Sequence, residues 1–160
     1  AIRYPRGSGL GVAIDEPLQQ LSTGNAQQLK AGKEVVFFVA GVMVEPCRKA
    51  SELLAAQGIQ AGVINARFIK PLDQEMIRRL SRDVGMIVTV EDNILAGGFG
   101  SAVLEYVNDQ QFNWIKMLRL GFPDKFIEHG TREQLLEKYG LTAQGIAESV
   151  GSFVKKFGAK

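Results

Sequence analysis

The sequence is poor in the side chains that bind metals and form disulfides. Its 160 residues include one cysteine, Cys47, and one histidine, His129. A single cysteine excludes an internal disulfide. One cysteine and one histidine are also too few for a zinc site built from several ligands of these two types. We therefore expect no metal site within this chain.

The sequence also lacks a strong excess of charge of either sign and a long hydrophobic run. Nineteen lysine and arginine residues stand against seventeen aspartate and glutamate residues, which leaves a net charge of +2. This balance is too even to indicate a nucleic-acid partner. The longest apolar run, at 35–44, has about half the length that a membrane-spanning helix needs. We expect neither nucleic acid nor a membrane as a partner, and a cytoplasmic location.

Common catalytic and nucleotide-binding motifs are missing as well. The sequence has no Gly-x-x-x-x-Gly-Lys loop, no Gly-x-Ser-x-Gly elbow and no His-Glu-x-x-His zinc motif. Gly7, Gly9 and Gly11 do not complete the dinucleotide-binding pattern, because no clear strand precedes them and no amphipathic helix follows. We therefore expect no catalytic residue and no self-contained active site in this chain.

The patterns that are present predict an α/β domain. Apolar residues make up 46% and charged residues 22%, a balance typical of folded globular proteins. Apolar runs rich in β-branched residues predict four buried strands, at 35–40, 61–68, 86–90 and 115–120. Amphipathic patterns predict helices between and after them, at 44–57, from Asp73 onwards, at 99–107, at 131–140 and at 146–157. This alternation predicts a mostly parallel sheet with helices on both faces, a three-layer α/β/α sandwich.

Local signals mark the ends of several predicted helices. Asp73 is a suitable N-cap, and Thr131 with Gln134 has the spacing of a capping box. Gly58 and Gly140 stand where C-terminal caps belong. The residues at 1–25 are rich in glycine and proline and predict a linker or arm, so we assign the α/β domain to 26–160. Because the chain opens with Ala1 rather than Met, we expect it to be part of a longer protein.

Two acidic residues, Glu91 and Asp92, directly follow the third predicted strand. Open α/β sheets bind ligands at the carboxyl ends of their strands, so these carboxylates are candidates for a ligand-binding edge. The same position equally suits side chains that hold the following turn or contact another domain. The sequence leaves these alternatives open.

Gly98 and Gly100 belong to a glycine run, at 97–100, that opens a helical pattern. The backbone N–H groups at such a helix start can hold an anion. Glycines are also required for a tight turn and for close packing of a helix on a sheet, and we favour this structural role.

The histidine and the cysteine each have a functional and a structural interpretation. His129 lies beside Glu128 in a predicted loop, where it could shuttle a proton. No candidate nucleophile lies nearby in the sequence, so we favour a role in organising the loop. Cys47 lies on the apolar stripe of its predicted helix, which predicts a buried and unreactive thiol.

Six stretches together resemble a known enzyme family. In order along the chain they lie at 1–7, 65–73, 88–92, 96–101, 118–124 and 126–130. The combined set closely resembles the C-terminal domain of the 1-deoxy-D-xylulose-5-phosphate synthases, which are transketolase-like enzymes that depend on thiamine diphosphate. The resemblance covers essentially the whole chain. The Lys-Pro-Leu-Asp stretch at 70–73 alone indicates only the wider family.

The resemblance implies a function for a longer parent protein. Such enzymes condense pyruvate with glyceraldehyde 3-phosphate, release carbon dioxide, and supply a precursor of isoprenoids, thiamine and pyridoxal. Thiamine diphosphate and Mg²⁺ lie between the two preceding domains, so this chain is expected to be a structural and assembly domain that binds neither and is inactive alone. Its implied partners are the preceding domains and the second subunit of a homodimer. The implied sheet has about five strands, with an antiparallel edge strand around 26–29.

The resemblance also implies a substrate contact in the arm. The Arg-Tyr-Pro-Arg-Gly stretch begins at Arg3, and its second arginine, Arg6, matches a residue associated with the phosphate of the aldehyde substrate. A guanidinium presents paired donors to phosphate oxygens, so the role is chemically reasonable. The weaker candidates for domain contacts or a ligand edge are Arg3, Arg67, Glu91, Asp92, Gly98, Gly100 and His129.

Two alternatives stay open at this point. The chain could be the equivalent domain of a transketolase or of the decarboxylase component of a 2-oxoacid dehydrogenase. It could instead be a stand-alone binding module in which Arg67, Glu91 and the glycines at 97–100 surround a small ligand. In the domain interpretation, apolar patches that normally meet other domains stay partly exposed, so the chain is expected to self-associate.

Overall fold

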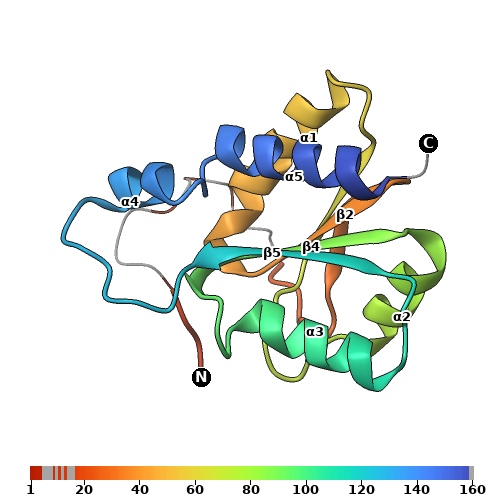
Figure 1. The fold of residues 1–160 in the computed structure, drawn as a ribbon. Coiled ribbons are helices and arrows are strands. Elements are labelled where there is room, and N and C mark those ends of the chain that lie inside the picture. Colours follow the sequence, from red (N-terminus) through yellow and green to blue (C-terminus); the bar gives the residue numbers. More distant parts are fainter. Residues whose placement is uncertain (5–8, 10, 12, 14–16, 159–160) are drawn as a thin grey trace.

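A computed structural model describes residues 1–4, 9, 11, 13 and 17–158. Its centre is a five-stranded sheet with the strand order β1-β3-β2-β4-β5 (Figure 1). The strands are β1 (Gln27–Lys30), β2 (Val35–Val39), β3 (Ala61–Asn65), β4 (Met86–Ile94) and β5 (Lys116–Phe122). Strand β1 runs antiparallel to β3, and the other neighbours are parallel. The predicted mostly parallel sheet with one antiparallel edge strand is confirmed.

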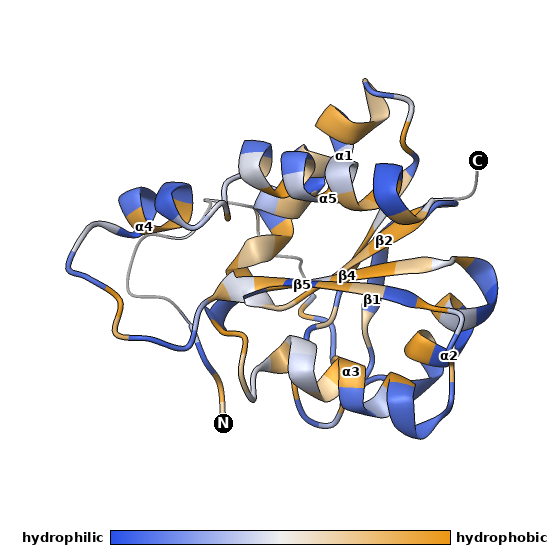
Figure 2. Ribbon diagram, viewed as in Figure 1, coloured by the Kyte–Doolittle hydropathy of each residue, from blue (hydrophilic) through white to orange (hydrophobic). Residues whose placement is uncertain are grey.

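Helices cover both faces of this sheet. One hydrophobic core lies between the sheet and α1 (Val44–Ala55), α4 (Arg132–Lys138) and α5 (Ala143–Phe157). A second core lies between the opposite face and α2 (Gln74–Asp83) and α3 (Phe99–Asp109). In Figure 2 the central strands are drawn mostly as hydrophobic, while hydrophilic residues occupy outward turns of the helices. The predicted α/β/α sandwich is therefore confirmed. Both hydrophobic cores are formed by residues of this chain.

The sequence of β2 explains its central position. All five residues are buried, and successive side chains pack alternately into the core on one face of the sheet and the core on the other. Phe37 packs in the core of α1, α4 and α5, whereas Phe38 packs in the core of α2 and α3. The Phe38 ring lies 5.2 Å from the ring of Phe99 at the start of α3. An apolar run without alternation is required wherever a strand is covered on both faces.

The predicted helix caps are present. The Asp73 carboxylate accepts a hydrogen bond from the Met76 N–H at 2.8 Å, and its other oxygen accepts from the Ala26 N–H at 2.7 Å. The Asp73 side chain thus caps the N-terminus of α2 and also binds the backbone just before β1. Thr131 and Gln134 form the complete capping box of α4. The boundary between an arm at 1–25 and the domain stays a prediction.

Among the strand ends that differ from the predictions, two change the surroundings of candidate residues. The strand predicted at 86–90 continues to Ile94, because β5 also continues to Phe122 and pairs with it across an irregularity in the register. Glu91 and Asp92 therefore lie within β4 rather than after it. The strand predicted at 61–68 ends at Asn65, and Arg67 has a left-handed backbone with φ of 57° that cannot continue a strand.

Among the residues that the structure describes, no helix combines the length and the apolar character that crossing a bilayer requires.

Candidate functional site

Several of the candidate residues lie along the carboxyl edge of the sheet. Strands β2 and β4 lie side by side, and the connections that follow them lead to opposite sides, to β3 and to β5. Such a switch in direction is where open α/β sheets bind their ligands. Glu91 and Asp92 on β4, Arg67 beyond β3, and Gly98 before α3 all lie along this edge.

Glu91 is a buried carboxylate that caps helix α3. Its residue is 2% exposed, and its two oxygens accept hydrogen bonds from the backbone N–H groups of Phe99 and Gly100, each at 2.8 Å. N–H groups in the first turn of a helix have no partner within the helix and lie at the positive end of its dipole. The carboxylate therefore occupies the position that an external anion would take.

Gly98 and Gly100 allow this close approach of helix and strand. A Cβ atom at Gly98 would lie 2.3 Å from the Ile94 carbonyl oxygen and 2.5 Å from Glu91 Oε2. A Cβ atom at Gly100 would lie 2.4 Å from Thr89 Oγ1. These geometries support the structural interpretation of the glycine run, because the N–H groups of Phe99 and Gly100 are already paired with Glu91 and a side chain at Gly98 or Gly100 would collide with its neighbours.

Sequence reasoning missed Arg119, which joins β5 to the same helix start. Its guanidinium donates to Ser101 Oγ at 2.7 Å and to the Leu95 carbonyl at 3.2 Å. Ser101 itself donates to the Leu95 carbonyl at 2.6 Å. Arg119 lies within the resembling stretch at 118–124, but an isolated arginine in the middle of a strand carries no sequence signal for this contact.

Asp92 joins three segments that are distant in the sequence. Arg3 donates to Asp92 Oδ1 at 3.0 Å and to the Asp92 carbonyl oxygen at 3.0 Å. Arg132, the first residue of α4, approaches Asp92 Oδ2 at 3.7 Å. The structure thus brings together the predicted candidates Arg3 and Asp92. Arg132 was missed, because only the fold places the start of α4 beside the end of β4.

The structure does not bring Arg67 and His129 into this arrangement. Arg67 is exposed, its N–H donates to Asn65 Oδ1 at 3.0 Å, and among the described residues it forms no ion pair with Glu91. His129 is exposed in the loop between β5 and α4. Its neighbour Glu128 accepts a hydrogen bond from the Tyr139 hydroxyl at 2.8 Å and pairs with Lys138, so this carboxylate holds the loop to α4.

Cys47 is fully buried in the core on the α1 side of the sheet. Burial raises the pKa of this thiol well above its usual value, because a thiolate would lose its hydration there. A thiol that stays protonated is a poor nucleophile and metal ligand. The predicted position on the apolar side of its helix is confirmed.

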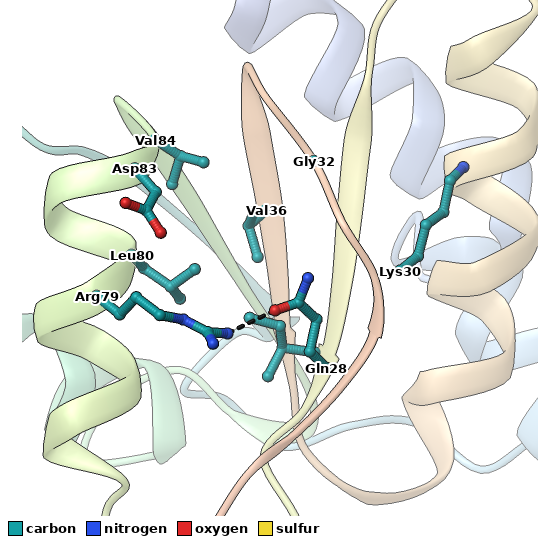
Figure 3. Close-up of a pocket in the computed structure, with 9 residues that line it drawn as sticks. Gln28, Lys30, Gly32, Val36, Arg79, Leu80, Asp83 and Val84 are labelled. Carbon is teal, nitrogen blue, oxygen red and sulfur yellow. Dashed lines mark hydrogen bonds between the residues drawn. The ribbon is translucent and has the colours of Figure 1, made fainter.

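A cavity between β1 and α2 is too small for a metabolite (Figure 3). Its volume is about 40 Å³, and it is lined among others by Gln28, Val36 and Arg79. Arg79 donates to Gln28 Oε1 across it, whereas Lys30 points away and donates to Ser51 on α1. Ligand sites usually measure about 300–1,000 Å³, so this space suits a few water molecules.

The described residues hold no group of three or more histidine, cysteine, aspartate or glutamate side chains placed to bind a metal ion. Arg6, the predicted phosphate contact, lies outside the described residues.

Comparisons with known proteins agree on one family. The sequence profile described as "Transketolase, C-terminal domain" matches residues 24–146. The chain is 44% identical over 155 residues to 1-deoxy-D-xylulose-5-phosphate synthase 1 of Geobacter metallireducens, which covers 97% of this chain and 25% of that protein. It is 47% identical over 148 residues to the synthase of Symbiobacterium thermophilum, covering 92% of this chain and 23% of that protein. The chain thus spans about a quarter of the length of these relatives.

A solved structure described as a split gene transketolase, an inactive beta4 tetramer, has the same fold. Its TM-score is 0.78 at 34% identity, covering 88% of this chain and 46% of that one. The resemblance to the synthases that the sequence motifs indicated is confirmed over nearly the whole chain. The chain belongs to the transketolase C-terminal domain family.

Proposed function

We propose that this chain is the C-terminal structural and assembly domain of a 1-deoxy-D-xylulose-5-phosphate synthase. The whole enzyme would condense pyruvate with glyceraldehyde 3-phosphate and release carbon dioxide. The observation that carries the proposal is the 44% identity that spans 97% of this chain but only 25% of the Geobacter metallireducens synthase. An identity of 34% to the split gene transketolase is lower, which favours a synthase as the parent.

The reaction's cofactor would lie outside this chain. In the proposed parent, thiamine diphosphate supplies the carbanion chemistry and is held through Mg²⁺, an ion that takes oxygen ligands. The described residues offer no cluster of carboxylates for that ion. The carboxylate of Glu91 is committed to two backbone N–H groups of α3. These residues do not fit the cofactor, so we assign its binding to the preceding domains.

The contribution of this chain to the site would be indirect, apart from one arginine. Arg3 is fixed to Asp92 at the carboxyl edge of the sheet, which gives the beginning of the arm a defined position. Arg6 follows three residues later and would contact the phosphate of glyceraldehyde 3-phosphate. The chain alone would then be inactive, because one substrate contact without cofactor or metal cannot form a site.

We also infer that the parent is a cytoplasmic homodimer to which this domain contributes contacts. The related split gene transketolase is described as an inactive tetramer of its beta chain, so a chain that carries this domain can assemble without activity. That description supports both an assembly role and the inactivity of the isolated domain.

The test compares the whole protein encoded by the gene with the 160-residue chain. We expect the whole protein to form 1-deoxy-D-xylulose 5-phosphate and carbon dioxide from pyruvate and glyceraldehyde 3-phosphate. We expect the chain alone to show no turnover and no heat of binding with thiamine diphosphate and Mg²⁺ in calorimetry. Micromolar binding by the chain would overturn the proposal, and so would a whole protein whose product formation does not depend on pyruvate.

A further inference from the structure

One corner of the molecule combines an ion-pair network around the half-buried Asp92 with unusually exposed apolar side chains. We call it the arm corner, and it is made up of residues 2–4, Asp92 and residues 123–132. Figure 1 shows the loop between β5 and α4 projecting from the sandwich at the end where the N-terminus also lies. The ion pairs of Asp92 with Arg3 and Arg132 connect these segments directly.

The network at Asp92 gives the corner a fixed geometry. The Asp92 side chain is 19% exposed, and its two oxygens face two different arginines. Arg3 also donates to the Asp92 backbone carbonyl, so its guanidinium contacts the strand at two points. Bidentate contacts of this kind restrict orientation as well as distance. The chain therefore leaves the sheet edge in a defined direction.

The loop between β5 and α4 is also held in place by contacts with Tyr139, but its largest apolar side chain, Phe126, is exposed to solvent. Lys125 lies over the Tyr139 ring at 5.4 Å, and Glu128 accepts a hydrogen bond from the Tyr139 hydroxyl. Between these two anchors Phe126 is fully exposed, with a relative accessibility of 104%. In the adjoining arm Ile2 is 90% and Tyr4 is 80% exposed. Large apolar side chains that are exposed in both the loop and the arm are typical of surfaces that another protein segment covers.

The Arg3–Asp92 contact and the length of the relatives bear on which segment could cover this surface. The relatives are about four times as long as this chain, because it covers 25% of the Geobacter metallireducens protein. Any preceding segment of a parent chain is covalently joined to the arm, and the Asp92 network fixes the arm at this corner. The covalent link gives such a segment a high effective concentration at Phe126.

We propose that the arm corner is the docking surface for the domain that precedes this one in the parent chain, with Phe126 as its apolar anchor and Asp92 as the residue that orients the arm. This inference rests on the proposed function, because it needs a parent chain. It goes further by assigning the contact to the carboxyl edge beside β4 and α4, and not to the outer faces of α1, α2, α3 or α5.

The test uses Phe126→Ser in both the whole protein and the 160-residue chain. Because Phe126 is fully exposed in the chain, its loss should leave the chain's unfolding midpoint unchanged. In the whole protein, we expect amide hydrogen exchange in residues 123–131 to become about tenfold faster as docking loosens. Leu104→Ser is the matched control, since Leu104 is an exposed apolar residue on α3, away from the corner.

The outcomes separate this inference from the proposed function. If exchange in the whole protein is the same for Phe126→Ser and Leu104→Ser, the docking surface lies elsewhere, while the synthase assignment stands. If Phe126→Ser converts a dimer of the 160-residue chain into monomers without affecting the whole protein, the occupant is a second copy and the inference is wrong. Asp92→Asn gives a second measurement, because it should increase exchange in the loop of the whole protein while Asp109→Asn, on exposed Asp109, should not.

Discussion

The carboxylate of Glu91 lies 2.8 Å from the backbone N–H of Gly100, and it also accepts the N–H of Phe99. A residue near the end of β4 thus provides the anion for the start of α3. At sheet edges of this kind a bound phosphate often takes that place. Here the interaction is internal and contributes to stability instead of ligand binding.

Replacing Glu91 should destabilise the fold. In Glu91→Gln the amide oxygen can accept one N–H, but the amide NH₂ then faces the other donor. We expect the free energy of unfolding to fall by about 1–3 kcal/mol, the cost of an unsatisfied buried donor. Urea unfolding measures this, with Glu105→Gln as the control, because Glu105 is exposed on the same helix. Equal stability of the two variants would contradict the capping role.

Glu91→Ala should in addition create an anion site. Removal of the carboxylate leaves the N–H groups of Phe99 and Gly100 unpaired at the positive end of the helix dipole. Phosphate should then raise the unfolding midpoint of Glu91→Ala, because a ligand that binds only the folded state stabilises it. The wild-type midpoint should not respond beyond the general effect of salt, measured with chloride at equal ionic strength.

The glycines beside Glu91 should tolerate no side chain. In Gly98→Ala the new Cβ would lie 2.3 Å from a backbone oxygen, and in Gly100→Ala it would lie 2.4 Å from Thr89 Oγ1. We expect each variant to lose about 1–3 kcal/mol of stability through backbone displacement. Gly85→Ala is the control, because its Cβ would have no atom within 4 Å. A Gly98→Ala variant as stable as Gly85→Ala would show that the helix start can move without cost.

Cys47 should make stability depend on pH in the alkaline range. Burial raises the pKa of its thiol above the usual 9.0, so the folded state keeps a proton that the unfolded state loses. Its contribution is complete below the unfolded pKa and decreases above it, by about 1.4 kcal/mol per pH unit. Cys47→Ala should lower stability at neutral pH through the lost packing, yet its stability should decline less steeply between about pH 8 and pH 10.5. Parallel pH profiles for the wild type and Cys47→Ala would contradict a raised pKa.

The sequence predicted the parts of the fold that depend on local patterns. The buried run of β2, the N-cap Asp73 and the capping box at Thr131 were all visible, because burial on two faces and helix capping each require particular residues at fixed spacings. The site was predicted less completely. Glu91 and Gly100 were both recognised as candidates, but the sequence does not show that the Glu91 carboxylate itself accepts the N–H groups at the start of that helix.

Contacts between distant segments were the least predictable. Arg119 and Arg132 have ordinary neighbours in the sequence, and only the pairing of β4 with β5 and the position of α4 bring them to Ser101 and Asp92. The end of β4 was missed for a related reason. Polar residues 91–93 end the apolar run, but the strand continues because β5 supplies a partner as far as Phe122.

Arg6→Ala in the whole enzyme tests the proposed substrate contact. The Michaelis constant for glyceraldehyde 3-phosphate should rise, with an apparent loss of about 1–3 kcal/mol for a charged hydrogen bond. The Michaelis constant for pyruvate, which carries no phosphate, should stay unchanged and serves as the internal control. A rise in both constants would indicate a general disturbance of the site, and an unchanged constant for the aldehyde would leave Arg6 as a linker residue.

A double-mutant cycle on Arg3 and Asp92 tests the network that orients the arm. The Arg3 side chain is 61% exposed, and ion pairs in such positions contribute about 0.2–1 kcal/mol. Global unfolding is a poor measure of so small a local contact, whereas protease cleavage in the arm follows local opening. Arg3→Ala and Asp92→Ala should each accelerate cleavage of the 160-residue chain, Arg3→Ala the more strongly because it also loses the bond to the Asp92 carbonyl oxygen, and the double variant should be cleaved little faster than Arg3→Ala.

The salt dependence of this cycle distinguishes the ion pair from the hydrogen bond to the backbone. At about 1 M salt the Debye length is about 3 Å, so the attraction between Arg3 and the Asp92 carboxylate is screened. The bond from Arg3 to the Asp92 carbonyl oxygen does not need the carboxylate and should survive in Asp92→Ala. Wild type and Asp92→Ala should therefore be cleaved at similar rates in high salt, while Arg3→Ala stays the faster. Equal rates for all three proteins at low salt would mean that the arm is held by contacts other than Arg3 and Asp92.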